Sequence, residues 1–404
     1  MVAIPQFLAG AMENWGLVLY SEVAMIYDEE VNTPSRKEVV ATIVSHELGH
    51  MWFGNLVTMD WWNHIWLNEG FATFNEYVGA DFVEPTWQMW DQFLISAMDS
   101  AFTADSRSTT SKPLIREAGW NLLEMFDTIT YSKGGSIVRQ LASFLSDDVI
   151  SRGINDYLTI HSYNNVVTDD LWNALTAADL GHRNTNVKMV MDTWTLQAGH
   201  PVVTVNRTDA DNAVATQRYF MMDPHDFYDA KYDHMGYTWY VPLTLTHGGN
   251  PDFVDFSLQW LNANSTANLD LSNVDANDWI LVNVNKLAFY RVNYDDENWK
   301  RLSEQLKDNH EVINPSSRAS IMDDAFKISQ PGHTDHVNAL RLTEYMDKEV
   351  EYVAWDIVIG NIDFTHNALL RTAEFGLFEL YWRTQITPLY ETLGWDFLLG
   401  DHLD

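Results

Sequence analysis

The sequence contains no cysteine, so a disulfide framework and thiolate chemistry are excluded for these 404 residues, and the compartment stays undetermined. Basic residues are scarce too, because 24 Lys+Arg stand against 57 Asp+Glu and give a formal net charge of −33. A surface this acidic repels phosphate backbones, so we expect no nucleic-acid partner. It favours cationic ligands such as the free amino terminus of a peptide, although acidity that only maintains solubility would give the same balance.

Long apolar runs are also missing, since no stretch approaches the roughly 18 consecutive apolar residues that span a bilayer. Hydrophobic residues still make up 46% of the sequence and aromatic residues 13%, which supports packed cores rather than disorder. A chain of this length has room for about two to four domains. We therefore expect a multidomain globular protein.

The chain contains three successive regions with different secondary-structure patterns. Residues 1–200 alternate strand-like pieces, such as 15–20, with long helical patterns, which predicts an α+β domain. Residues 201–293 predict a small β-sandwich, because short β-rich runs are separated there by Asn, Asp and Gly; the runs are 202–205, 241–246 and 280–284. Residues 294–404 predict the start of an all-α helical solenoid, with helical patterns at 299–306, 316–328 and 337–346.

Residues 1–200 contain the sequence pattern of a catalytic zinc site. It reads His46-Glu47-Leu48-Gly49-His50 and is followed, after eighteen intervening residues, by Glu69. Residues four apart on a helix project from nearly the same face, so His46 and His50 can offer two imidazole nitrogens to one metal ion. Glu69 would complete three protein ligands and leave a fourth position open for water, as in catalytic rather than structural zinc sites.

The flanking residues predict two helices. Ser35, Arg36, Lys37 and Glu38 form a capping box, in which the Ser35 hydroxyl and the Glu38 carboxylate satisfy backbone donors at the start of the histidine helix. Glu69 opens a second helical pattern, and Glu76, seven residues on, returns to the same face. We therefore expect the Glu76 carboxylate to face the metal site as well.

A second motif stands upstream, Gly10-Ala11-Met12-Glu13-Asn14, with Glu13 33 residues before His46. Together with the blocks at 46–58, 66–72 and 126–134, it resembles the M1 (gluzincin) family of zinc metallo-aminopeptidases, and within it the aminopeptidase N branch of animals, particularly the invertebrate kind. The resemblance extends through 191–197 and 290–295, hence over nearly the whole chain. Lys112 departs from the family pattern, because relatives commonly have His there.

This resemblance implies a thermolysin-like catalytic domain over 1–200, a β-sandwich over 201–293, and the first part of the family's C-terminal helical domain over 294–404. It also implies that the chain corresponds to an internal fragment that lacks the N-terminal domain of the family. The expected activity is hydrolysis of the first peptide bond of peptides with a free N-terminus.

The resemblance also assigns roles to residues. His46, His50 and Glu69 would hold one Zn²⁺ per subunit, and Glu47 would be the general base. Tyr131 would stabilise the transition state.

The upstream motif would bind the substrate. Glu13 would hold the α-amino group, helped by Glu69 or Glu76, while the backbone of Gly10, Ala11, Met12 and Asn14 forms an edge along which the peptide lies.

Localisation and partners are implied in the same way. The family suggests an ectoenzyme at the plasma membrane, with a cytoplasmic homologue as the alternative, a membrane anchor in parts outside this sequence, and a homodimer as one assembly. Two other functions stay open: a cell-surface binding receptor, and the epoxide hydrolase activity of one M1 branch. Ala11 favours the aminopeptidases over that branch.

Overall fold

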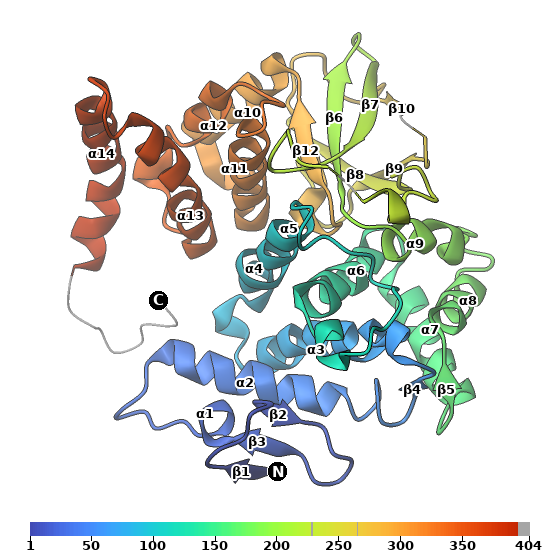
Figure 1. Cartoon of the computed structure of the whole chain (residues 1–404). Helices are drawn as coiled ribbons and strands as arrows, with labels where there is room; N and C mark the ends of the chain where they lie inside the picture. The colour runs from blue at the N-terminus through green and yellow to red at the C-terminus, as the bar shows by residue number, and fades with distance from the viewer. Residues whose placement is uncertain (228, 265, 395–404) are drawn as a thin grey trace. The chain divides into compact units, whose positions relative to one another are not determined.

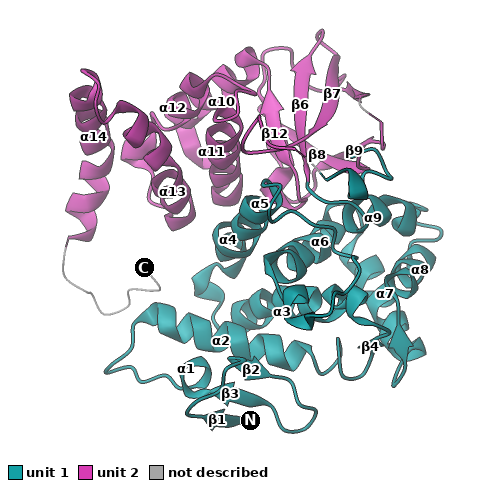
Figure 2. Cartoon of the chain, viewed as in Figure 1, with its two compact units in different colours: residues 1–199, 228–237, 400–404 teal, residues 200–227, 238–399 magenta. Residues whose placement is uncertain are grey.

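A computed structural model describes residues 1–227, 229–264 and 266–394 (Figure 1). The chain divides into two compact units, which Figure 2 distinguishes by colour. The first comprises Met1–Gly199 and a short segment that ends at Tyr237; the second begins at His200 and contains both the later strands and the helices that follow them. The main segment of the first unit ends at Gly199, and the segment that ends at Tyr237 belongs to the same unit although it lies later in the chain.

A small sheet opens the first unit, and it contains the upstream motif. Strand β3 (Leu19–Ser21) lies in the middle, parallel to β1 (Val2–Ile4) and antiparallel to β2 (Ala11–Met12). The strand predicted at 15–20 is mostly wrong, because only its last two residues lie in β3. Gly16 has φ +82°, and the amide of Leu17 donates to the Asn14 carbonyl, so this segment turns instead of extending.

Helices make up most of the rest of this unit. They are α1 (Glu22–Met25), α2 (Pro34–Gly49), α3 (Trp66–Val83), α4 (Met89–Phe93), α5 (Asp99–Asp105), α6 (Gly134–Gln140), α7 (Asp147–Ile160), α8 (Thr168–Ala178) and α9 (Val187–Thr195). Two π-helical turns, Leu94–Met98 and Ile129–Lys133, join α4 to α5 and lead into α6. A parallel pair of short strands, β4 (Thr58–Met59) and β5 (Asn165–Val166), completes the unit.

The histidine helix α2 begins differently from the prediction. Thr33 is its N-cap residue, Pro34 occupies the first turn, and no side chain caps the backbone, so the capping box at 35–38 is wrong. The Ser35 hydroxyl lies 2.9 Å from the Thr33 hydroxyl instead. Proline explains the earlier start, because its fixed φ suits the first helical position and its missing N–H is not needed there.

Glycines allow α2 and α3 to pack closely. A Cβ added at Gly49 of α2 would lie 2.9 Å from the Asn75 side-chain amide of α3, and one at Gly79 of α3 would collide with Ser45 of α2. Along the same helix, Trp66 is fully buried and its indole N–H donates to the Thr168 hydroxyl over 3.0 Å. Packing against the rest of the unit therefore fixes the position of α3 beside α2.

Two sheets form the β part of the second unit. One has the order β10-β7-β6-β12 and consists of β6 (Pro201–Arg207), β7 (Asn212–Tyr219), β10 (Thr266–Asp270) and β12 (Arg291–Tyr294), with β12 parallel to β6. The other, β11-β8-β9, is antiparallel and consists of β8 (Val241–His247), β9 (Ser257–Leu261) and β11 (Ile280–Val282). All three predicted β-rich runs are confirmed as strands, in β6, β8 and β11.

The helices of this unit are α10 (Asp296–Asn309), α11 (Pro315–Ser329), α12 (His336–Leu342), α13 (Tyr352–Leu369) and α14 (Phe375–Leu393). The predicted helices at 299–306 and 316–328 are confirmed within α10 and α11. The one at 337–346 ends too late in the prediction, because α12 stops at Leu342. The Thr343 hydroxyl hydrogen-bonds to the Leu340 carbonyl and to Tyr381, which competes with continuation of the helix.

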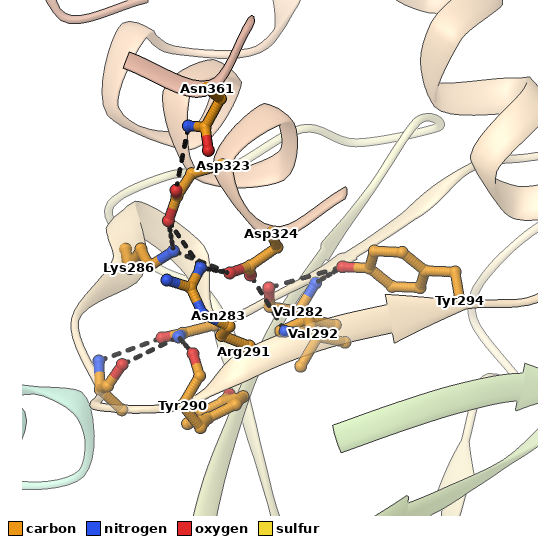
Figure 3. A network of polar contacts seen from close by, with 11 residues as sticks. Val282, Asn283, Lys286, Tyr290, Arg291, Val292, Tyr294, Asp323, Asp324 and Asn361 are labelled. Atoms are coloured by element: carbon orange, nitrogen blue, oxygen red, sulfur yellow. Dashed lines mark hydrogen bonds and ion pairs between the residues drawn. The ribbon is translucent and has the colours of Figure 1, made fainter. Parts of the chain in front are cut away.

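Four buried charges join α11 to the strands (Figure 3). Lys286 Nζ lies 3.0 Å from Asp323 and 2.8 Å from Asp324, and Arg291 lies 2.7 Å and 3.0 Å from the same carboxylates. None of these side chains is more than 5% exposed. The β12 amide of Val292 also donates to Asp324. Two positive and two negative groups therefore compensate one another where α11 packs on β12.

Removing one charge from this cluster should destabilise the second unit. Asp323→Asn leaves a buried positive charge uncompensated, and we expect a loss of about 3–5 kcal/mol in the free energy of unfolding. Chemical denaturation of wild type and variant measures it. Glu304→Gln is the matched control, because Glu304 lies 3.8 Å from Lys300 on the exposed face of α10. Equal unfolding midpoints for the two variants would refute the importance of the cluster.

Candidate functional site

The end of α2 and the first turn of α3 bring together three side chains that could hold a metal ion. His46 Nε2 lies 3.1 Å from His50 Nε2, and each of these nitrogens lies 3.3 Å from Glu69 Oε2. All three residues are buried. Within the part of the chain that the structure describes, no other group of three His, Cys, Asp or Glu side chains converges in this way. The ligand triad expected from the sequence therefore comes together.

The spacing of these atoms fits a zinc ion. Zinc bonds to imidazole nitrogen and carboxylate oxygen are about 2.0–2.2 Å long, and tetrahedral angles then place neighbouring ligand atoms about 3.3 Å apart. The three observed separations are 3.1 Å, 3.3 Å and 3.3 Å. The distances between the three ligand atoms are therefore those expected around one zinc ion.

Each histidine is oriented through its other ring nitrogen. His46 Nδ1 lies 2.7 Å from Glu76 Oε1, and His50 Nδ1 lies 2.9 Å from the carbonyl oxygen of Phe53. Both acceptors hold a proton on Nδ1, so Nε2 is the nitrogen of each ring that faces the site, a common arrangement of metal-binding histidines. Glu76 faces the site, as its spacing from Glu69 predicted. The Phe53 carbonyl was missed, because a backbone oxygen in a turn leaves no trace in the sequence.

The charges of the site favour a cation at its centre. Burial lowers the pKa of His46, but hydrogen bonds to Glu69 and Glu76 outweigh it and raise that pKa to about 10. Burial likewise raises the pKa of Glu69, but hydrogen bonds from His46 and His50 prevail and lower it to about 2. Glu69 is therefore an anion at neutral pH and stabilises positive charge beside it.

Glu47 differs from the other carboxylates of the site. Burial raises its pKa to about 7, although the charges of His46 and His50 oppose the shift. Its Oε2 atom is buried and, among the described residues, has no hydrogen-bond partner. A carboxyl group that titrates near neutrality can both accept and release a proton, as a general base and acid must.

Tyr131 lies beside the triad on the π-helical turn Ile129–Lys133. Its ring is 6.0 Å from that of His46, and the two planes are 19° apart. Burial, the charge of Glu69 and a hydrogen bond with Glu69 all raise the pKa of Tyr131, so its hydroxyl stays protonated and can donate. Single π-helical turns are rare in proteins overall, but those that occur often lie at functional sites.

Three ion pairs hold this turn, and sequence reasoning missed all of them. Before it, Asp127 accepts from the Thr130 amide over 3.0 Å and pairs with Arg116 at 3.0 Å; Lys112 lies 3.6 Å from the same carboxylate. Lys112, which departs from the family pattern, thus has a partner at the start of the turn.

At the end of the turn, Lys133 Nζ lies 2.7 Å from Asp105 Oδ2 and donates to the Gly199 carbonyl over 3.1 Å. Both charged side chains are completely buried. Because breaking such a pair is costly, the turn that carries Tyr131 is fixed at this end as well.

The upstream motif forms the edge strand of the small sheet. Ala11 and Met12 pair with β3, Gly10 has φ +81° before them, and exposed Asn14 begins the turn after them. Half-buried Glu13 lies between strand and turn, and the Asn55 side chain donates to its carbonyl over 2.8 Å.

The charge of Glu13 reaches the triad. It contributes to the raised pKa values of Glu47, His50 and Tyr131. The expected amine anchor and the expected metal ligands therefore belong to one site.

The arrangement is typical of a metallopeptidase site. It combines two histidines at the end of α2, a glutamate from α3, Glu47 between the histidines, and β2 at the edge of its sheet. The comparisons with known proteins agree. Residues 1–194 match the peptidase family M1 domain, and residues 279–404 match the ERAP1-like C-terminal domain. The chain therefore contains a peptidase family M1 domain followed by an ERAP1-like C-terminal domain.

Relatives align over nearly the whole chain. Aminopeptidase Ey of Gallus gallus is 39% identical over 400 residues, and aminopeptidase N of Homo sapiens is 38% identical over 399; each alignment covers 96% of this chain. Glutamyl aminopeptidase of Sus scrofa is 37% identical over 407 residues. The chain spans about 40% of the length of the first two relatives and 42% of the third. None of the described helices combines the length and apolar composition needed to cross a membrane.

Contact between two glycines sets the distance from α3 to the Tyr131 turn. A Cβ at Gly70 would lie 2.9 Å from the Cα atom of Gly134, which is backbone and cannot rotate away. We expect Gly70→Ala to displace the turn and to cost about 1–3 kcal/mol of stability. Thermal unfolding measures the loss.

Gly119→Ala is the control, because nothing lies within 4 Å of a Cβ there. If the two alanine variants unfold at the same temperature, the glycine contact does not set this distance.

Proposed function

We propose that the protein is a zinc-dependent aminopeptidase that hydrolyses the first peptide bond of peptides with a free N-terminus. The observation that carries the proposal is the convergence of His46, His50 and Glu69 beside Glu47, within the field of Glu13. The M1 domain and the aminopeptidase relatives support it. Nearly the whole chain aligns with those relatives, although it spans only part of their length.

His46, His50 and Glu69 would hold the zinc ion. Bound zinc would lower the pKa of a water molecule toward 7 and polarise the scissile carbonyl. Glu47 accepts the proton of the attacking water and passes it to the leaving amine. Burial raises the pKa of Glu47 above the ordinary value of a carboxyl group, which makes the carboxylate a stronger base for the first transfer.

Tyr131 and Glu13 act on the substrate. The protonated Tyr131 hydroxyl donates a hydrogen bond to the carbonyl oxygen as negative charge develops on it, which stabilises the transition state more than the ground state. Glu13 binds the α-ammonium group, helped by the negative field of Glu76, and the β2 edge aligns the peptide backbone. Because Glu13 fixes the amine one residue away from the metal, only the first peptide bond lies at the metal.

We extend the proposal to the finer architecture and the setting of the protein. Residues 1–200 form a thermolysin-like domain, 201–293 a β-sandwich and 294–404 the first part of a helical solenoid; the two sheets and the helices after Tyr294 support this division. By the family resemblance the protein acts as an ectoenzyme at the plasma membrane, with the cytoplasm as the alternative.

Glu76 tests the zinc assignment independently of catalysis. Glu76→Gln weakens the acceptor for His46 Nδ1–H, and changes of this kind cost about 10–100-fold in metal affinity. Competition with a fluorescent zinc chelator measures the dissociation constant. Glu84→Gln is the matched control, because Glu84 directly follows α3 and pairs with Lys37. Equal zinc affinity in both variants would show that Glu76 does not contribute to metal binding through His46.

Glu47 tests the reaction. Glu47→Gln removes the base but none of the three ligands, so zinc should stay bound while turnover of a neutral peptide falls at least about 10²–10⁴-fold. Mass spectrometry should show wild type releasing only the N-terminal residue, and an N-acetylated copy of the peptide should resist. Undiminished turnover by Glu47→Gln would contradict the base assignment. Stoichiometric zinc without any turnover by wild type would favour the binding receptor.

A further inference from the structure

We propose that Asn55 is a positioning residue that fixes the distance between the amine anchor Glu13 and the metal ligands. The inference rests on the proposed function, because it takes Glu13 as the group that binds the α-ammonium. Asn55 itself touches neither metal nor substrate. It would act by holding the backbone from which the Glu13 side chain projects.

Strand pairing alone does not hold Glu13. The pairing of β2 with β3 comprises Ala11 with Tyr20 and Met12 with Leu19, and it ends there. Glu13 lies one residue beyond, where the chain turns toward Gly16. The side-chain amide of Asn55 donates to the Glu13 carbonyl over 2.8 Å and supplies a tie at this point. The same amide lies 3.6 Å from Met51 Sδ, which helps to orient it.

The turn that carries Asn55 also holds a metal ligand. It follows α2, and the Asn55 backbone amide donates to the His50 carbonyl over 2.9 Å. Two residues earlier, the Phe53 carbonyl lies 2.9 Å from His50 Nδ1. Between them, Gly54 has φ +134°, and a Cβ there would lie 3.4 Å from His50 Nδ1. One tight turn therefore fixes the imidazole of His50 and the carbonyl of Glu13 at the same time.

A second connection links this turn to the segment after Glu13. The Leu56 carbonyl accepts from the Tyr163 amide over 2.7 Å, and the Tyr163 ring stacks on Trp15 with centroids 5.8 Å apart. Glu13 is thus tied directly through Asn55, and Trp15, two residues on, is held through Tyr163. This second contact limits how far the segment can move when Asn55 is changed, so the unit should still fold.

The spacing between anchor and metal decides which peptide bond is cut. An exopeptidase anchor must hold the ammonium one residue from the reacting carbonyl, and misplacement by about 1 Å can cost 10²-fold in rate. Loss of the Asn55 donor frees the Glu13 backbone. We expect the affinity for a free amine to fall, while an N-blocked ligand that never used Glu13 is unaffected.

Asn55→Leu tests this in the full chain loaded with zinc, because leucine keeps the size of asparagine without the donor. Calorimetric titration with L-leucine, which has the free amine but no amide bond to hydrolyse, should show about five- to tenfold weaker binding than wild type, with no change for N-acetyl-L-leucine. kcat/KM for peptides with a free N-terminus should fall by the same factor. Zinc content and unfolding temperature should not change. If Asn55→Leu does not fold, Asn55→Ala removes the same donor without adding apolar branches.

Two comparisons separate positioning from general damage. Asn165→Ala is the matched control, because it removes a similar amide-to-carbonyl hydrogen bond, 3.0 Å long, to Met59. It should leave the affinity for both ligands as in wild type. In a Glu13→Ala background, Asn55→Leu should change kcat/KM less than about twofold, because the group that it positions is gone.

The outcomes distinguish this inference from the proposed function. Equal loss of affinity for the amine and the N-acetyl ligand, full additivity with Glu13→Ala, or no change in amine binding would each overturn the role of Asn55. A wild-type protein that does not turn over peptides would refute the aminopeptidase proposal instead. Selective amine binding that depends on Asn55 would still support the inference in that case.

Discussion

The site depends on bringing one carboxylate and two imidazoles within 3.3 Å of one another inside the protein. Removing Glu69 from water is unfavourable unless positive charge or hydrogen-bond donors surround it, and the histidines supply them. The arrangement requires α2 and α3 to approach closely, which small residues at Gly49 and Gly79 permit. The contact of Gly70 with Gly134 then places Tyr131 beside the same triad.

Residues related by helical periodicity could be predicted from the sequence. The four-residue spacing of His46 and His50 and the seven-residue spacing of Glu69 and Glu76 both translate directly into shared helix faces. The contacts that hold the site residues in place do not follow a periodic pattern in the sequence. Lys133 and Asp105 are 28 residues apart, and the fold alone shows that they meet. The carbonyl of Phe53 belongs to a turn whose backbone direction no side-chain pattern records.

In the fold, too, the sequence pattern predicted some features and missed others. Short β-rich runs identified β6, β8 and β11, and helical patterns identified α10 and α11. The errors lie at boundaries set by single residues. Gly16 turned an apolar segment away from the sheet, Pro34 moved the start of α2, and the Thr343 hydroxyl ended α12 early. Each of these effects depends on local backbone geometry that an apolar pattern does not contain.

The four buried charges of the second unit restrict how this region can change during evolution. Any single substitution that alters one sign leaves a surplus charge away from water, so lineages should exchange Lys286 or Arg291 only together with Asp323 or Asp324. Covariation between the β12 region and α11 is therefore expected among homologues. Apolar side chains at all four positions would also be compatible with the packing. Reaching that state by single substitutions would require several destabilised intermediates, because each leaves a buried charge uncompensated.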